Sequence, residues 1–301
     1  MKDKTSSFDK SLRRKALEVQ FRLGESVRLL RKVSGVSQAS LGAVLELHQT
    51  AICRVEKGSQ SLTPAELFLV GKFFGVSINR LVEGDIDFWK VAEKFNRNPP
   101  FPARYREFPF SKVRDFLPFL EFVRASSGET YTNALISRLK LNPLYLRSLD
   151  QKLSTHVVLD FLRAIISEKR LRASDMGDIL RLAREPKAHG FLDLIYREQR
   201  QSIDLVQSWV LNARYYDENF IYRIVEAAPR NLLISVQASE HMQKVDFHDP
   251  VLGDFLCKYR KLFLAEFPRY IGKSPLRLTE RECLYHSGSK CMYQLNLQDS
   301  A

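Results

Sequence analysis

Three cysteines and a glutamate near the end of the chain have the types and spacing of metal ligands. The four residues are Cys257, Glu280, Cys283 and Cys291. The pattern predicts strands over residues 276–285 and 291–297, joined by a turn at residues 287–289. In that hairpin Cys283 and Cys291 lie opposite each other, with Cβ atoms roughly 4.5–5.5 Å apart. Two thiolates on one face can share a metal, and three sulfurs with one carboxylate oxygen suit tetrahedral Zn²⁺.

Glu280 fits a straight strand poorly. It lies an odd number of residues from Cys283, so regular alternation points it to the opposite face of the hairpin. A bulge or a strand end near Thr279 would bring the two residues to one face. Otherwise His286, in the loop, is the substitute fourth ligand.

Other roles for the cysteines stay open. Free cysteine is among the most buried residue types, so the three could simply fill the core. They could also be redox-active thiols. A disulfide between Cys283 and Cys291 is disfavoured in the reducing cytoplasm, which is the compartment that we predict from the absence of an export signal.

Apolar residues at helical spacing predict a string of five short helices between residues 21 and 85. Ser37 is a good N-cap for a helix over residues 38–45, and Gly58 ends the helix over residues 49–57. Thr63 followed by Pro64 starts the fourth helix.

A sequence motif in this region resembles the helix-turn-helix of phage repressor and Cro-type (XRE-family) regulators. The matching residues are Ser37-Gln38-x-x-Leu41-x-x-x-Leu45-x-Leu47-x-x-x-x-Ile52-x-Arg54-Val55-Glu56-Lys57-Gly58. The resemblance implies that residues 38–45 brace the DNA backbone and that residues 49–57 enter the major groove. It also implies a homodimer on a two-fold operator in double-stranded DNA.

Individual roles follow from the resemblance. Base-edge candidates are Gln49, Thr50 and Arg54, since Gln and Arg can make bidentate bonds to bases. Phosphate-contact candidates are Gln38, Lys57 and Arg31. Glu56 is expected to be a buried or half-buried structural partner instead.

Three positions depart from the family pattern. Gly42 stands where a small residue, often alanine, is usual, and Glu46 replaces the glycine of the turn. His48 occupies a position where a serine or threonine N-cap is usual. Each change is expected to lower helix stability by roughly 1 kcal/mol. Cys53, within the predicted recognition helix, is expected to be a packed filler.

The spacing Cys257-x22-Glu280-x2-Cys283-x7-Cys291 resembles that of 4-vinyl-reductase-type sensor domains of phenol-responsive bacterial activators. The resemblance implies a structural zinc, held by these four residues, beside a pocket for a small aromatic or apolar effector. The aromatic residues of a predicted helix over residues 202–225 are the candidates to line that pocket, namely Trp209, Tyr216 and Phe220. The remaining histidines, among them His189 and His248, form no ligand pair and are expected to be surface or core residues.

The predicted fold class is an all-α five-helix helix-turn-helix domain, a mostly helical middle and an α+β C-terminal sensor domain with an antiparallel sheet. The domains are residues 1–20 (N-terminal extension), 21–85 (DNA-binding), 86–102 (linker), 103–185 (helical region, either separate or part of the sensor and dimerisation unit) and 186–298 (ligand sensor). The linker is placed by the proline-rich run at residues 98–102.

Composition narrows the class of function. The chain of 301 residues has 47 Lys+Arg against 35 Asp+Glu, a formal net charge of +12. Residues 1–83 hold 14 Lys+Arg and 8 Asp+Glu, a net +6, so this quarter is the more basic part of the chain per residue. The charge favours an anionic partner such as nucleic acid. No stretch approaches the roughly 20 apolar residues of a membrane span, so no membrane partner is predicted.

The sequence therefore predicts a cytoplasmic transcriptional regulator that binds DNA and senses a small effector. The alternative is a zinc- or thiol-redox-responsive transcription factor without an organic ligand. The chain has no Gly-rich phosphate loop, no G-x-S-x-G and no H-E-x-x-H motif, so no enzymatic activity is predicted.

Overall fold

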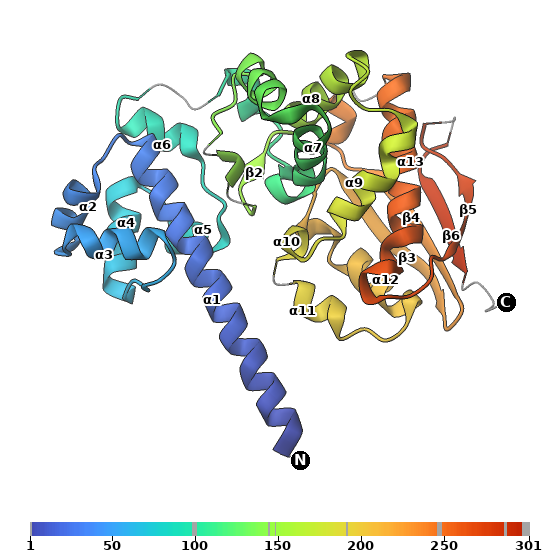
Figure 1. The fold of residues 1–301 in the computed structure, drawn as a ribbon, viewed down its shortest axis with the longest axis horizontal. Helices are drawn as coiled ribbons and strands as arrows, with labels where there is room; N and C mark the ends of the chain where they lie inside the picture. The colour runs from blue at the N-terminus through green and yellow to red at the C-terminus, as the bar shows by residue number, and fades with distance from the viewer. Residues whose placement is uncertain are drawn as a thin grey trace. The chain divides into compact units, whose positions relative to one another are not determined.

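The computed structural model describes residues 2–97, 101–143, 145–147, 149–190, 192–245, 249–285 and 288–296. This part of the chain holds thirteen α-helices and, towards the C-terminus, a four-stranded antiparallel sheet (Figure 1). The chain divides into two compact units. Unit 1 comprises Met1–Arg106 with Ile136–Lys152, and unit 2 comprises Glu107–Leu135 with Leu153–Ala301.

Unit 1 begins with a series of helices whose ends carry ordinary capping signals. They are α1 (Lys2–Val33), α2 (Gln38–Leu45), α3 (Gln49–Glu56), α4 (Pro64–Phe74), α5 (Ile78–Glu83) and α6 (Phe88–Lys94). At the start of α2 the Ser37 Oγ accepts the N–H of Ser40 at 2.9 Å. Thr63 and Glu66 form a capping box at α4. The ranges of α2 to α5 agree closely with the predicted helices.

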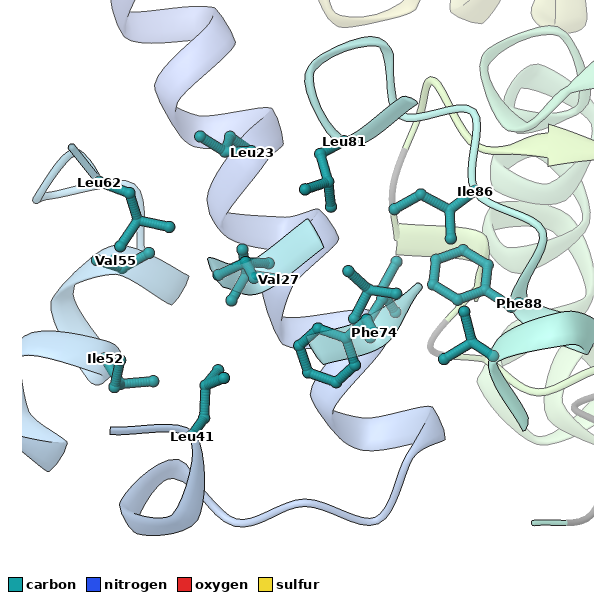
Figure 2. Close-up of a cluster of buried hydrophobic side chains, with 14 of the residues drawn as sticks. Leu23, Val27, Leu41, Ile52, Val55, Leu62, Phe74, Leu81, Ile86 and Phe88 are labelled. Carbon is teal, nitrogen blue, oxygen red and sulfur yellow. The ribbon is translucent and has the colours of Figure 1, made fainter. Parts of the chain in front are cut away.

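Buried side chains from these helices form one apolar core (Figure 2). Leu41 of α2, Ile52 of α3 and Phe74 of α4 surround Val27 of α1, and all four are at most 1% exposed. Burial of each such side chain contributes roughly 1.5–3 kcal/mol. This core determines which face of α3 points inward.

Two predicted boundaries differ from the structure. Residues 1–20 were expected to form a separate extension, but residues 2–20 are the first part of α1. Residues 86–102, expected to be a linker, contain α6, and Phe88 and Val91 of this helix belong to the core of unit 1. The physical reason is apolar burial, because the segment before the proline-rich run packs onto α1 and α4. Residues 98–100 of that run lie outside the described residues.

Unit 1 also includes a segment from far along the chain, within the predicted middle region 103–185. Tyr145 joins the same core, with its ring 4.9 Å from that of Phe88 in an edge-to-face arrangement. Asp150 accepts a hydrogen bond from Arg22 of α1 at 3.1 Å. The middle region is thus divided between the two units.

Unit 2 combines helices with the sheet. Its helices are α7 (Val113–Arg138, whose last residues belong to unit 1), α8 (Thr155–Ser167), α9 (Met176–Ala183), α10 (Pro186–His189), α11 (Leu192–Arg197), α12 (Ser202–Leu211) and α13 (Pro250–Glu266). The predicted helices over residues 116–123 and 131–139 are both part of α7, which is broken at Gly128, where φ is 85°. The short strands β1 (Ser111–Lys112) and β2 (Lys152–Leu153) lie outside the main sheet.

The sheet has the strand order β3-β4-β6-β5. The strands are β3 (Phe220–Ala228), β4 (Asn231–Ala238), β5 (Arg277–Glu282) and β6 (Cys291–Asn296). Ile234 of β4 pairs with Tyr293 of β6, and both are fully buried. In unit 2, α12 and α13 lie against this sheet (Figure 1). The helix before the C-terminal hairpin and the second strand of the hairpin agree with the prediction. The first strand, β5, ends at Glu282 and not at Tyr285, so Cys283 lies just beyond it.

The predicted helix over residues 202–225 is wrong in its second half. Helix α12 ends at Leu211, and Phe220 and Tyr222 lie in β3, paired with Ala238 and Val236 of β4. Aromatic and β-branched residues favour a strand when a partner strand is available, and β4 provides that partner. Within the described ranges, no helix combines the length and apolar character needed to cross a lipid bilayer.

Candidate metal centre, cavity and nucleic-acid interface

Cys257, Glu280 and Cys283 form a group that could hold a metal ion. One ligand atom from each lies within 4.8 Å of the other two. The Sγ atoms of Cys257 and Cys283 are 3.4 Å apart, and Glu280 Oε1 lies 3.4 Å from the Cys257 Sγ. Two sulfurs bound tetrahedrally to one zinc at 2.3 Å are about 3.8 Å apart, so the group needs only a small expansion to hold the ion.

A bulge in β5 brings Glu280 to the same side as Cys283. Glu280 pairs with Tyr293 and Glu282 pairs with Met292, so Arg281 is the extra residue of the bulged strand. The odd separation of Glu280 and Cys283 requires such an irregularity if both residues are to bind one metal ion.

Cys291 lies beside the three-residue group but is not part of it. It is fully buried at the start of β6, and its Sγ accepts the N–H of Leu284 at 3.3 Å. A hydrogen bond between the Cys257 and Cys291 thiols raises the pKa of Cys257 and lowers the pKa of Cys291 to about 5. Cys291 is therefore the thiol that ionises first, and the thiolate is the form that binds metals.

The second oxygen of Glu280 is held by a lysine. Lys261 Nζ lies 2.8 Å from Glu280 Oε2. Burial opposes ionisation of the carboxyl group, but hydrogen bonds from Lys261 and Cys257 outweigh it and lower the pKa of Glu280. The carboxylate is thus ionised and oriented with one oxygen towards the thiols. His286, the alternative ligand, lies outside the described residues.

A cavity of about 100 Å³ lies inside unit 2. The predicted pocket residues Trp209, Tyr216 and Phe220 all line it, although they come from α12, the loop that follows it and β3. Further aromatic wall residues are Phe119, Tyr222, Tyr259 and Phe263. The Trp209 ring lies 5.0 Å from that of Phe263 and 5.9 Å from that of Tyr216. Aromatic side chains therefore form a large part of the walls.

Several polar groups line the same cavity. Arg260 of α13 is 6% exposed, its Nε donates to the Tyr222 hydroxyl at 3.1 Å, and its guanidinium lies 3.9 Å from the centre of the Phe220 ring. Burial, with the nearby charge of Asp217, raises the pKa of Asp115 to about 8. Burial raises the pKa of Asp217 to about 6.

His189 also lines the cavity, although the sequence analysis assigned it no role. The Tyr216 hydroxyl donates to Tyr196 at 3.1 Å, so it accepts from His189 Nδ1 at 2.8 Å. Burial, with the charge of Arg114, lowers the pKa of His189 to about 3, so the ring is neutral. Its Nε2 is a buried acceptor with no hydrogen-bond partner in the described part of the chain.

The polar cavity residues that the sequence did not reveal are Arg114, Asp115, His189, Asp217 and Arg260. One signal was present for Arg260, because it interrupts the leucine row formed by Leu252, Leu256 and Leu264 along a helix. No comparable signal marked Arg114 and Asp115, which come from the middle region.

The exposed face of α3 carries most of the predicted DNA contacts. Gln49, Thr50 and Arg54 are exposed, whereas Ile52 and Val55 on the opposite face are buried. Lys57, at the C-cap, is also exposed. Arg54 donates through Nε to the Gln60 side chain at 2.9 Å.

Arg31 is not available as a phosphate contact, which corrects the prediction. It is 8% exposed and forms an ion pair with Glu56, with Nη2 2.9 Å from Oε2. Its Nη1 donates to the Val36 carbonyl at 3.1 Å. Gln38, predicted to hold a phosphate, is half-buried and donates to the same Glu56 oxygen at 2.9 Å. The buried, structural role predicted for Glu56 is confirmed.

The three departures from the family pattern have local explanations. A Cβ on Gly42 would lie 2.5 Å from the Leu47 carbonyl oxygen, so glycine lets the turn pass close to α2. Glu46 adopts the left-handed conformation, with φ at 56°, at the C-cap of α2. His48 caps α3 through Nδ1, which accepts the Thr50 N–H at 3.4 Å. The turn is thus formed without the usual residues.

No protein-family model, curated protein or solved structure matches the chain.

Proposed function

We propose that the protein is a DNA-binding transcriptional regulator with a separate effector-binding unit. The observation that carries this proposal is the two-sided character of α3. Its apolar face is anchored in the core of unit 1, and its exposed face presents Gln49, Thr50 and Arg54. These are residue types that read base edges in the major groove.

The proposal assigns α2 and α3 to a helix-turn-helix of the repressor and Cro type. Helix α3 enters the major groove, and Lys57 contacts a phosphate beside it. A homodimer places two copies of α3 on a two-fold operator. The basic character of residues 1–83 supports binding to a polyanion.

The proposal also assigns a structural zinc to unit 2. Cys257, Glu280 and Cys283 supply three ligands, and Cys291, within hydrogen-bonding reach of Cys257, supplies the fourth. When bound, zinc cross-links α13 to β5 and β6 in a closed four-ligand site, which is the arrangement of structural zinc. The cavity beside it then accepts a small effector, and effector binding changes the operator affinity of the dimer.

The first test concerns sequence-specific binding. Selection from a random duplex library, followed by fluorescence anisotropy at fixed salt, should yield a two-fold motif. Arg54→Ala should weaken binding by about 1–3 kcal/mol and relax the preference at one base pair. Lys57→Ala should weaken binding to all sequences alike and reduce the salt slope by about 1. Lys72→Ala, an exposed lysine on α4, is the matched control and should have little effect. Failure to select any motif would refute the proposal.

A second candidate function is metal or thiol sensing without an organic effector. The close approach of the Cys257 and Cys283 sulfurs, 3.4 Å apart, favours it, because an oxidant or a metal would change this contact directly. Chelator titration separates the two functions. A structural zinc leaves slowly and unfolds unit 2, whereas a sensory metal exchanges with the fold intact and changes operator affinity.

A further inference from the structure

Arg260 is a buried cation whose hydrogen-bonding capacity is only partly used. Its Nε donates to the Tyr222 hydroxyl, and its guanidinium carbon lies over the Phe220 ring, 3.9 Å from the ring centre. Its Nη1 is buried without a hydrogen-bond partner among the residues that the structure describes. Trp209 Nε1, on another wall of the same cavity, is likewise a buried donor with no such partner. A buried donor left unpaired is destabilising, so both groups point to an acceptor that is supplied from outside the chain. The acceptor of the same cavity that has no partner in the described ranges, His189 Nε2, is satisfied only by a donor.

The charges around the cavity do not cancel. Arg114 and Arg260 contribute two cations, and Asp115 and Asp217 contribute two carboxyl groups. Asp217 already accepts the Asn219 N–H at 2.9 Å. Burial raises the pKa of Asp115 to about 8, so this carboxyl group is largely neutral at pH 7. Among these four lining groups positive charge is in excess, which an anionic occupant would balance and a cationic one would increase. Cys291, outside the lining, is a further acidic group whose charge acts on Arg260.

The walls limit the shape of the occupant. Trp209, Phe220 and Phe263 provide flat apolar surfaces, which favour an aromatic ring over a flexible polar molecule. A volume of about 100 Å³ is of the same order as a cavity of roughly 150 Å³ that holds one benzene ring. The volume thus limits the occupant to a single ring.

We propose that the cavity binds a small aromatic carboxylate, whose carboxylate accepts hydrogen bonds from Arg260 Nη1 and whose ring packs among the aromatic wall residues. Arg–carboxylate hydrogen bonds are charge-assisted, and a buried site strengthens them. This inference names the chemical class of the effector, so its regulatory meaning rests on the proposed function.

The test compares four single-ring probes by isothermal titration calorimetry on the full-length protein: benzoate, benzyl alcohol, phenol and benzylamine. Benzoate should bind about tenfold or more tightly than each of the others, because only it pairs its charge with Arg260. Arg260→Gln should remove this preference for benzoate, and Arg260→Lys should retain part of it. Lys258→Gln, an exposed lysine on the same helix, is the control and should leave the preference intact.

Several outcomes would overturn the inference. Benzylamine, phenol or benzyl alcohol binding as tightly as benzoate would do so, and so would the absence of binding by all four probes to the wild-type protein. The comparison among probes needs no variant, so misfolding of Arg260→Gln does not block it. Fluorescence anisotropy with the selected operator, with and without benzoate, separates the two proposals. Benzoate binding to a protein that binds no operator refutes only the proposed function, and operator binding without benzoate binding refutes only this inference.

Discussion

Arg31 of α1 and Glu56 of α3 form a buried ion pair beneath the proposed DNA-reading surface. The guanidinium also donates to the Val36 carbonyl, and Glu56 receives a further hydrogen bond from Gln38 of α2. The pair therefore links three helices and sets the position of α3 relative to α1. Under the proposed function, the pair acts on DNA binding through the geometry of α3 and not by contact with phosphate.

Removal of one partner of this pair should be strongly destabilising. Arg31→Ala leaves the Glu56 carboxylate buried without its cation, which typically costs about 3–5 kcal/mol. Arg31→Met combined with Glu56→Leu should recover most of that loss, because it removes both charges and keeps the volume. Urea unfolding, followed by circular dichroism, measures the free energy of unfolding of the single and the double variant. Arg54→Ala is the exposed control, expected to stay within about 0.5 kcal/mol of wild type. An equal, small effect of Arg31→Ala and Arg54→Ala would show that the pair is not buried in solution.

Gly42→Ala should destabilise unit 1. The new Cβ would lie 2.5 Å from the Leu47 carbonyl oxygen, and the backbone would have to shift, at a cost of about 1–3 kcal/mol. Gly177→Ala in α9 is the matched control, because its Cβ would meet no atom within 4 Å and alanine favours a helix by up to about 1 kcal/mol. The midpoint temperature of thermal unfolding should therefore fall for Gly42→Ala and rise for Gly177→Ala. A stabilised Gly42→Ala variant would contradict the close approach of the turn to α2.

Zinc binding can be measured by native mass spectrometry of the full-length protein. We expect one zinc ion per chain and a dimer. Cys257→Ser and Cys283→Ser should both lose the metal, because these residues belong to the three-residue group. Cys291→Ser decides whether the fourth ligand is a thiolate: loss of zinc supports it, and full retention removes Cys291 from the site. Cys53→Ser in α3 is the control and should retain the metal. A metal-free wild-type protein with intact thiols would refute the zinc assignment.

Burial of Asp115 should make stability depend on pH. Its pKa is raised to about 8 in the folded protein from an ordinary value of 3.8, so the folded state keeps a proton that the unfolded state loses. Asp217, Arg260, Tyr222 and Tyr259 are the ionisable groups that interact with it. The contribution of protonated Asp115 to the free energy of unfolding is complete below about pH 4. It is lost as the pH rises towards 8, with a slope of at most about 1.4 kcal/mol per pH unit.

Asp115→Asn removes this titration and provides the measurement. The free energy of unfolding of wild type minus that of Asp115→Asn should fall between pH 5 and pH 8. Asp178→Asn, at an exposed position on α9, serves as the control and should show no such fall. A difference between wild type and Asp115→Asn that stays constant with pH would mean that Asp115 is ionised in the folded protein.

Local sequence signals determined helices α2 to α5 of unit 1 and the C-terminal hairpin. Ser37, Thr63 and Gly58 act within one helical turn of their own positions, so their effect can be predicted without knowledge of the rest of the fold. The spacing of Cys283 and Cys291 predicted the hairpin for the same reason, whereas the group that could hold a metal joins Cys283 to Glu280 and to Cys257 of α13.

Tertiary structure alone decided the contacts between residues that are distant along the chain. Arg31 has the residue type of a phosphate contact, and only its pairing with Glu56 removed it from the surface. Phe220 continued a helical pattern until the pairing of β3 with β4 made it part of a strand. The cavity brings Asp115 from α7 together with Arg260 from α13, and no local pattern encodes a contact over that separation. Burial and charge pairing depend on which elements pack together, and that choice is made by the whole chain.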